Sequence, residues 1–197
     1  MKTLTLASTS AIRASLLKAA GVAFEVVAPG VDEATMRDEM QAAGISPAGV
    51  AILLARAKAQ FASYEQRGLV IGADQTLEFE GVLYNKAADL AEARARLQAL
   101  RGRTHQLHAA VATARQGEQL WSETVTASLT MRDFSDAFLD SYLERNANAA
   151  LWSVGCYELE AEGIQLFERI EGDYFAILGL PLTGLLAHLR EEGLVVQ

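Results

Sequence analysis

The stretch LVIGADQTLEFEGVLYNK, residues 69–86, decides the fold of this chain. Its opening apolar run, residues 69–73, is too short for a helix and too apolar for a surface loop, so it predicts a buried strand. Asp74 follows directly where this run stops. Because ligands of open α/β sheets gather at the carboxyl ends of strands, Asp74 is a candidate catalytic acid.

The second half of this stretch predicts a hairpin. Glu80-Gly81 is a two-residue hairpin signal between two short apolar segments. If Phe79 pairs with Val82, Lys86 lies across from Gln75, and an ammonium returns to the level of the carboxylate. An acid and a base at one strand end indicate phosphate or metal chemistry. A surface hairpin with an incidental ion pair is the alternative.

The composition is that of an ordinary globular protein. The chain has 197 residues, of which 51% are hydrophobic and 21% charged, enough for one domain or two small lobes with a continuous core. No apolar run approaches the roughly 20 residues of a membrane span, and MKTLTLASTS at the N-terminus lacks the apolar core of a signal peptide. The single cysteine, Cys156, excludes an internal disulfide and a cysteine-based zinc cluster. We therefore expect a cytoplasmic protein with no membrane partner.

The charge of the chain restricts its partners. The net charge is −8 and the pI is about 4.9, which argues against a large nucleic-acid footprint. A phosphorylated small molecule remains compatible with this charge, because it needs a few local cations rather than a basic protein.

The N-terminal segment predicts a strand, residues 4–7, followed by a helix over residues 11–20. Ser10 is a natural N-cap for this helix, in a Ser8-Thr9-Ser10 segment. Arg13 then occupies the third helical position, where a cation opposes the helix dipole. A bound anion would resolve this conflict, because amides, hydroxyls and the guanidinium would all face it. The alternative is an arginine that extends into solvent.

Two further segments contribute charged candidates. The acids of Val31-Asp32-Glu33 follow a second predicted strand, residues 24–28, and are either metal ligands or the solvated start of a helix. Residues 47–67 predict a helix with an apolar stripe, and Lys58 leaves from the edge of that stripe. Spacing alone favours a snorkelling lysine over one that enters a phosphate site.

The rest of the chain alternates between predicted helices and strands. Asp89 and Ser135 are expected to cap helices that run to about residue 100 and to residue 145, and a last helix is expected over residues 182–192. Strands are expected over residues 106–114, 120–131, 151–157 and 164–170. A solvated acidic edge strand is the simplest interpretation of Glu158, Glu160 and Glu162. This order indicates a single α/β domain with a mixed central sheet flanked by helices, in two lobes around a substrate cleft.

Several short motifs, taken together in order, resemble the Maf family of nucleoside triphosphate pyrophosphatases over nearly the whole chain, and the family implies a Maf/ITPase-like fold. The motifs are Leu6-Ala7-Ser8-Thr9-Ser10 with Arg13 and Leu16-Leu17, then Val31-Asp32-Glu33, residues 55–59, Gly72-Ala73-Asp74 with Lys86, residues 166–174 and Gly179-Leu180-Pro181-Leu182.

This resemblance implies hydrolysis between the α- and β-phosphates of a nucleotide, with a divalent cation such as Mg²⁺ or Mn²⁺. Asp74 would be the acid–base residue that activates water, and Glu33 and Asp74 would hold the metal. The phosphate ligands would be Ser8, Ser10, Arg13, Lys58 and Lys86. These roles suit phosphoryl transfer, which needs cations to spread charge and a carboxylate to orient water. The resemblance also implies a possible homodimer.

The resemblance implies that three positions, Ile12, Gln75 and Glu160, set the base preference. Gln75 and Glu160 resemble the branch that acts on 7-methyl-GTP, since the dTTP/UTP branch shows Thr and Gln there. A carboxylate at Glu160 can accept hydrogen bonds from the N1–H and 2-amino groups of guanine. Ile12 departs from the Trp of that branch, and Ala11 and Ala87 depart from prolines. A dTTP/UTP or broad-specificity pyrophosphatase is the alternative, and a nucleotide-binding regulator of cell division without catalysis is another.

Overall fold

The structure is a computed structural model that describes residues 3–196; residues 1, 2 and 197 of the expected domain lie outside the described part. The strands are β1 (Leu4–Ala7), β2 (Glu25–Val27), β3 (Leu69–Phe79), β4 (Val82–Tyr84), β5 (Thr104–Arg115), β6 (Glu118–Met131) and β7 (Phe167–Glu171). They form one sheet in the order β2-β1-β3-β5-β6-β7, with β4 paired to β3. The β1 pairings are parallel and the others antiparallel, so the sheet is mixed.

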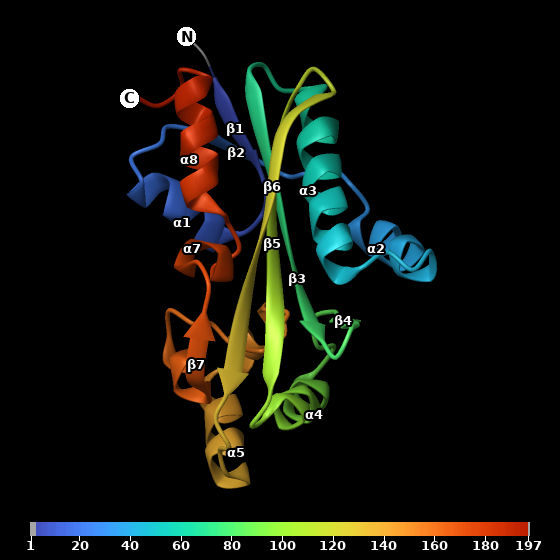
Figure 1. The fold of residues 1–197 in the computed structure, drawn as a ribbon, viewed down its shortest axis with the longest axis vertical. Helices are drawn as coiled ribbons and strands as arrows, with labels where there is room; N and C mark the ends of the chain where they lie inside the picture. The colour runs from blue at the N-terminus through green and yellow to red at the C-terminus, as the bar shows by residue number, and fades with distance from the viewer. Residues whose placement is uncertain (1–2, 197) are drawn as a thin grey trace.

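Helices flank this sheet (Figure 1). They are α1 (Ala11–Ala19), α2 (Glu33–Ala42), α3 (Pro47–Ser63), α4 (Leu90–Leu100), α5 (Asp136–Arg145), α6 (Ala147–Trp152), the 3-10 helix η1 (Glu162–Leu166), α7 (Tyr174–Ile177) and α8 (Leu182–Glu191). The predicted α/β class with a mixed central sheet is confirmed.

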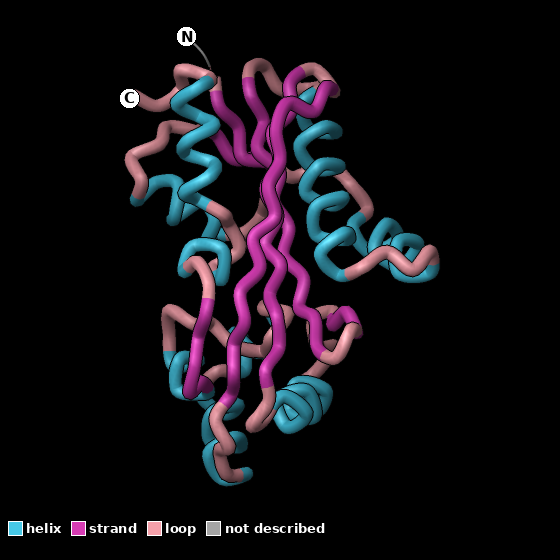
Figure 2. The backbone as a smooth tube through the Cα atoms, in the orientation of Figure 1, coloured by secondary structure: helices cyan, strands magenta, loops and turns pink. Residues whose placement is uncertain are grey.

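Three long strands, β3, β5 and β6, run through both halves of the molecule (Figures 1 and 2). In one half they are flanked by α1, α3 and α8, and in the other by α4, α5 and β7. Each half has its own apolar core, one including Leu6, Ile71 and Leu185 and the other including Leu77 and Leu129.

Helix α3 lies unusually close to the sheet. Its contact surface consists of small residues, with Ala55 and Ala59 packed against alanines of β5. On β3, a Cβ atom added to Gly72 would lie 2.2 Å from the carbonyl oxygen of Ala55 and 2.5 Å from the nitrogen of Ala59. Only glycine at this position lets the helix backbone approach so closely. The side chain of Lys58, on the same helix, is thereby brought to the sheet.

The predicted helix starts are confirmed at three places. Ser10 accepts a hydrogen bond from the amide of Arg13, Asp89 caps α4, and Ser135 caps α5. These caps satisfy amides that a helix start leaves without partners.

The end of the central strand differs from the prediction. The strand does not stop at Asp74, because β5 pairs with β3 beyond this point and holds Asp74 opposite Ala110. The strand that stops here is its neighbour β1, whose last pair joins β3 at Gly72. The hairpin register of Phe79 with Val82 is confirmed, but the pairing ends at Tyr84. Lys86 therefore lies outside the ladder, and its predicted place across from Gln75 is wrong.

The segment after α5 also differs from the prediction. Residues 151–157 complete α6 and then turn, instead of forming a strand. The turn is closed by the hydroxyl of Ser153, which accepts from the amide of Tyr157, and by Cys156, whose φ of 62° is left-handed. Glu158 lies in an irregular segment, Glu160 lies in a turn and Glu162 starts η1, so the predicted acidic edge strand is also wrong. The following strand starts at Phe167. Alternation of polar and apolar residues did not distinguish this compact turn from an extended strand.

Within residues 3–196, no helix has the combination of length and hydrophobicity that is needed to cross a membrane.

Candidate active site

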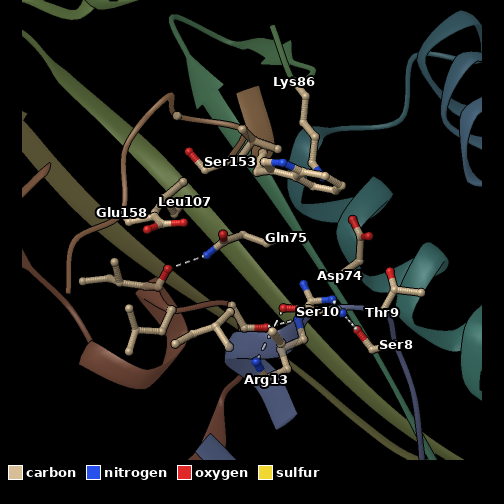
Figure 3. Close-up of a pocket in the computed structure, with 18 of the residues that line it drawn as sticks. Ser8, Thr9, Ser10, Arg13, Asp74, Gln75, Lys86, Leu107, Ser153 and Glu158 are labelled. Carbon is tan, nitrogen blue, oxygen red and sulfur yellow. Dashed lines mark hydrogen bonds between the residues drawn. The ribbon is translucent and has the colours of Figure 1, made fainter. Parts of the chain in front are cut away.

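A pocket of about 690 Å³ opens between the two halves of the molecule (Figure 3). Its walls come from the end of β1, the first turns of α1 and α2, the middle of β3, and the segments around residues 152–160 and 177–179. The residues selected from the sequence all line this pocket: Ser8, Ser10, Ile12, Arg13, Glu33, Lys58, Asp74, Gln75, Lys86 and Glu160.

The pocket lies at a gap in the edge of β3. Strand β1 pairs with β3 up to Gly72, and β4 pairs with it from Leu77 onward. In the described part of the chain, residues 73–76 have no strand beside them on this edge. The carbonyl of Ala73 inside the gap accepts hydrogen bonds from two cationic side chains instead. An interrupted sheet edge thus provides both the space and the polar backbone of the site.

Asp74 and Lys58 form a buried ion pair at the centre of the site. The distance from Lys58 Nζ to Asp74 Oδ1 is 2.8 Å, and the two side chains are 4% and 5% exposed. Lys58 Nζ also lies 2.8 Å from Oε2 of Glu33, at the first position of α2. Asp74 follows Gly72 by two residues on β3, so both lie on the face of the sheet that packs against α3, the helix that carries Lys58. Lys58 therefore does not extend into solvent.

Arg37 is a fourth charged residue here, and the sequence analysis missed it. Its Nη2 lies 3.7 Å from Oδ2 of Asp74. This carboxylate oxygen is buried and has no hydrogen-bond partner among the described residues. Arg37 follows Glu33 by four residues on α2, so both lie on one face of that helix. The i, i+4 spacing from Glu33 was the signal that could have found it.

Arg13 has a different environment from the one its position suggested. The side chain is half-buried, and its guanidinium donates to the carbonyls of Ala73 and Gly179, both at 2.8 Å, and to Oγ of Ser8 at 3.3 Å. Burial lowers the pKa of Arg13, while Asp74 and Glu33 act in the opposite direction. The dipole conflict at the start of α1 is thus resolved by backbone carbonyls. Through these hydrogen bonds Arg13 connects β3 to the loop before α8 at the pocket.

Lys86 is the exposed cation of the site. Its Nζ lies over the indole ring of Trp152, 5.4 Å from the ring centroid. Desolvation lowers the pKa of Lys86, and the positive charges of Arg13, Arg37 and Lys58 lower it further, whereas Glu33 raises it. A lysine surrounded by cations in this way is a ready partner for a polyanion.

The three expected specificity residues occupy different walls. Gln75 points away from Asp74 and donates from Nε2 to the carbonyls of Ala176 and Ile177, so its amide nitrogen is already engaged (Figure 3). Ile12 is partly buried and packs against the apolar core that includes Leu77 and Leu129. Glu160 is exposed on the wall formed by the turn after α6, together with Glu158, which the sequence analysis placed in an edge strand.

The site offers few carboxylates to a metal ion. The described residues contain no group of three or more His, Cys, Asp or Glu side chains that could hold a metal by themselves. Two carboxylates, Glu33 and Asp74, meet at Lys58, and Oδ2 of Asp74 has no hydrogen-bond partner. Mg²⁺ is commonly bound by one or two carboxylates together with substrate phosphates and water. The residues therefore fit a cation that arrives with a phosphorylated ligand.

The fold and the site define an α/β protein whose pocket surrounds a buried carboxylate with cations. The family model described as Maf-like protein matches residues 3–192, and the chain belongs to this family. It is 57% identical over 189 residues to a nucleoside triphosphate pyrophosphatase of Caulobacter vibrioides, covering 96% of this chain and 95% of the relative. It is 49% identical to a 7-methyl-GTP pyrophosphatase of Rhizobium meliloti, covering 98% and 97%.

A solved structure of a HAM1 protein from Coxiella burnetii is a more distant match. It has a TM-score of 0.43 and 13% identity, covering 68% of this chain and 75% of that chain. The family assignment rests on the sequence matches.

Proposed function

We propose that this chain is a nucleoside triphosphate pyrophosphatase that releases pyrophosphate and a nucleoside monophosphate, with 7-methyl-GTP as its favoured substrate. The reaction class is supported by the relatives, which carry the name nucleoside triphosphate pyrophosphatase or 7-methyl-GTP pyrophosphatase. The observation that carries the proposal is the buried Asp74 carboxylate, held by Lys58 and faced by Arg37 inside the pocket. A purely structural role would not require this concentration of charge.

Asp74 is suited to activate water. Its Oδ1 is bound to Lys58 Nζ, which fixes the carboxylate, and Oδ2 has no hydrogen-bond partner among the described residues, in a residue that lines the pocket. In the proposed reaction Oδ2 accepts the proton of a water molecule as that water attacks phosphorus. The bond between the bridging oxygen and one phosphorus breaks, and the electron pair leaves with pyrophosphate or with the monophosphate, depending on which phosphorus is attacked.

Cationic side chains stabilise the charge of the phosphates. Lys86 and Arg37 line the pocket and are the cations with exposed surface toward it. Arg13 is half-buried and Lys58 is buried, and both are hydrogen-bonded to the Ala73 carbonyl. They therefore act chiefly by fixing the edge of β3 and through the electrostatic field of their charges. Ser8 and Ser10 supply hydroxyls and backbone amides at the start of α1, a favourable place for an anion.

A divalent cation belongs to this proposal. Glu33 and Asp74 would hold it, and when bound with the substrate it would neutralise negative charge on the phosphates. The position of Lys58 between the two carboxylates keeps them together before the substrate arrives.

The favoured base is the finer part of the proposal. Glu160 lines the pocket and can accept from a purine edge, and several relatives at 46% to 49% identity carry the name 7-methyl-GTP pyrophosphatase. The alternative, a dTTP/UTP pyrophosphatase, predicts the highest kcat/KM for dTTP and UTP instead of 7-methyl-GTP.

The decisive experiment is pyrophosphate detection with purified protein, Mg²⁺ or Mn²⁺, and a panel of nucleoside triphosphates that includes 7-methyl-GTP, GTP, dTTP and UTP. We expect pyrophosphate release, with the highest kcat/KM for 7-methyl-GTP. Release from no nucleotide would reject the enzyme, and tight nucleotide binding without turnover would support the regulator instead. A preference for dTTP and UTP would reject the base assignment alone.

A further inference from the structure

We propose that Trp152 is the platform on which the base of the substrate stacks, and that Lys86 moves from this platform to the phosphates when the base arrives. The inference rests on the proposed function, because it assigns the base subsite of the same pocket. The family motifs quoted above include Lys86 as a phosphate ligand, but they assign no role to Trp152. Trp152 is the last residue of α6, within the segment that was predicted to be a strand.

Trp152 is unusually exposed for a tryptophan. Its relative exposure is 73%, although tryptophan is among the residues with the largest apolar surface. The same residue lines the pocket that contains Asp74. An exposed indole at the wall of a pocket has an open ring face that a flat ligand can cover. A nucleobase, which has two flat π faces, is a ligand of the right shape.

The pair of Lys86 and Trp152 shows that this ring face accepts a cation. Lys86 Nζ lies over the ring at 5.4 Å from its centroid, a cation–π contact. The ammonium also interacts electrostatically with Glu33, Arg13 and Arg37. Lys86 therefore links the indole to the charged residues around Asp74. This arrangement is compatible with a nucleotide whose phosphates lie at Asp74 and whose base lies at Trp152.

The chemistry around the ring favours a positively charged purine. A 7-methylated guanine carries a positive charge on its ring system, so it gains cation–π attraction on the indole as well as stacking. Two exposed carboxylates, Glu158 and Glu160, line the same wall and can accept from N1–H and the 2-amino group. Uncharged pyrimidines offer a smaller π face and lack this donor pair.

Stacking of the base and the release of Lys86 are coupled in this arrangement. The base and the ammonium compete for the same indole, so a stacked base displaces the ammonium. The polyphosphate of the same molecule is then the strongest available partner for the displaced charge. Base recognition thereby places a cation on the phosphates.

Intrinsic fluorescence tests the stacking without any turnover. The chain has two tryptophans, and the other one, Trp121, stacks on His188 outside the pocket. In a Trp121→Phe variant all tryptophan emission comes from Trp152. We expect 7-methyl-GMP to quench this emission in a saturable manner without metal, and tripolyphosphate, which has no base, not to quench it by stacking. No quenching by any nucleotide would overturn the proposal.

Kinetics of Trp152→Leu and Trp152→Phe then measure what the stacking contributes. Removing one base–aromatic stack costs about 10-fold to 100-fold in affinity, so Trp152→Leu should raise KM for 7-methyl-GTP by that factor, and Trp152→Phe should raise it less. Inhibition by tripolyphosphate should not weaken in either variant, because tripolyphosphate has no base to stack on the indole. Circular dichroism confirms that each variant is folded.

The outcomes separate this inference from the proposed function. If the parent protein hydrolyses nucleotides and Trp152→Leu has the same KM for each of them, the stacking role is wrong and the proposed function stands. If the parent hydrolyses none but the fluorescence is quenched, Trp152 binds a base in a chain that is not a pyrophosphatase. A shift in oligomeric mass of Trp152→Leu with unchanged nucleotide affinity would assign the exposed indole to a contact between copies, and would overturn the inference.

Discussion

The ammonium nitrogen of Lys58 lies 2.8 Å from Oδ1 of Asp74, and neither side chain is more than 5% exposed. The same nitrogen lies 2.8 Å from Oε2 of Glu33. One buried cation therefore holds two carboxylates at the open edge of β3. Because both carboxylates belong to the proposed mechanism, this ion pair connects the stability of the fold with its activity.

Replacing Lys58 should destabilise the protein strongly. In Lys58→Met the carboxylate of Asp74 loses the partner at 2.8 Å while it remains buried. Removal of one partner of a buried pair costs about 3–5 kcal/mol, and we expect this loss in urea unfolding. Adding Asp74→Asn should recover part of it, since the unpaired charge is then gone. Lys18→Met, at an exposed position of α1, is the control; equal losses in both single variants would contradict the buried pair.

Asp74→Asn should remove activity and keep the fold. The amide has the shape of the carboxylate but cannot take a proton from water, and general base catalysis contributes about 10²-fold to 10⁴-fold. Lys58 keeps its contact with Glu33 in this variant, which limits the loss of stability. Pyrophosphate release and the thermal melt should be measured on one preparation. A variant with near-parental kcat would remove Asp74 from the mechanism.

Arg37→Gln should lower kcat/KM without a large change in stability. Arg37 Nη2 lies 3.7 Å from Asp74 Oδ2 and the side chain is 21% exposed, so it is available to a bound phosphate. Loss of a charge-assisted hydrogen bond costs about 1.5–3 kcal/mol, which corresponds to roughly a 10-fold to 100-fold lower kcat/KM. Arg67→Gln removes the same charge outside the pocket and should leave kcat/KM unchanged. Similar effects of the two changes would indicate a general charge effect.

Gly72→Ala should damage both packing and activity. The new methyl group would lie 2.2 Å from the carbonyl oxygen of Ala55, which is backbone and cannot rotate away. Helix α3 must then move from the sheet, and Lys58 moves with it. Overpacking of this kind costs about 1–3 kcal/mol or more, and the melting temperature and kcat should fall together. An unchanged melt would mean that α3 does not pack as closely as described.

Stability should fall as the pH is lowered because of His105. The ring is buried and hydrogen-bonded to the hydroxyl of Tyr157, and desolvation lowers the pKa of His105 from 6.5 to about 4. Between these values the unfolded chain binds a proton that the folded chain does not. The free energy of unfolding should therefore decrease by at most about 1.4 kcal/mol per pH unit between pH 6.5 and 4.

The comparison variant for this pH dependence is His105→Gln, which keeps a hydrogen-bonding amide and does not titrate. Its urea unfolding curves should show a smaller decrease over the same pH interval. Parallel pH profiles for the parent and the variant would assign the decrease to other groups.

Much of the fold could be predicted from local patterns. The caps at Ser10, Asp89 and Ser135, the hairpin register of Phe79 with Val82 and the mixed α/β class depend on residues close in sequence, and each was confirmed. The candidate site residues were likewise predicted from motifs, and the structure places all of them in one pocket.

The errors arose where a distant partner decides the conformation. Asp74 was expected at a strand end, but β5 continues to pair with β3 opposite Ala110. The segment containing Trp152 was expected to be a strand, but it ends a helix and turns at Cys156, next to the buried hydrogen bond between Tyr157 and His105. The periodicity of apolar residues indicates which side chains are buried, but it does not indicate which distant segment a stretch of backbone will pair with or pack against.

The sequence by itself determined the elements, their caps and the set of charged residues that this protein brings to a polyphosphate. Only the tertiary structure decided what those charges contact: Arg13 binds the carbonyl of Gly179, 166 residues away, and Lys86 rests over Trp152. The physical reason is the sequence separation over which each interaction acts. Helix caps and hairpin turns are stabilised by hydrogen bonds within a few residues, whereas the partner of a buried charge is set by desolvation and packing between segments that are distant in the chain.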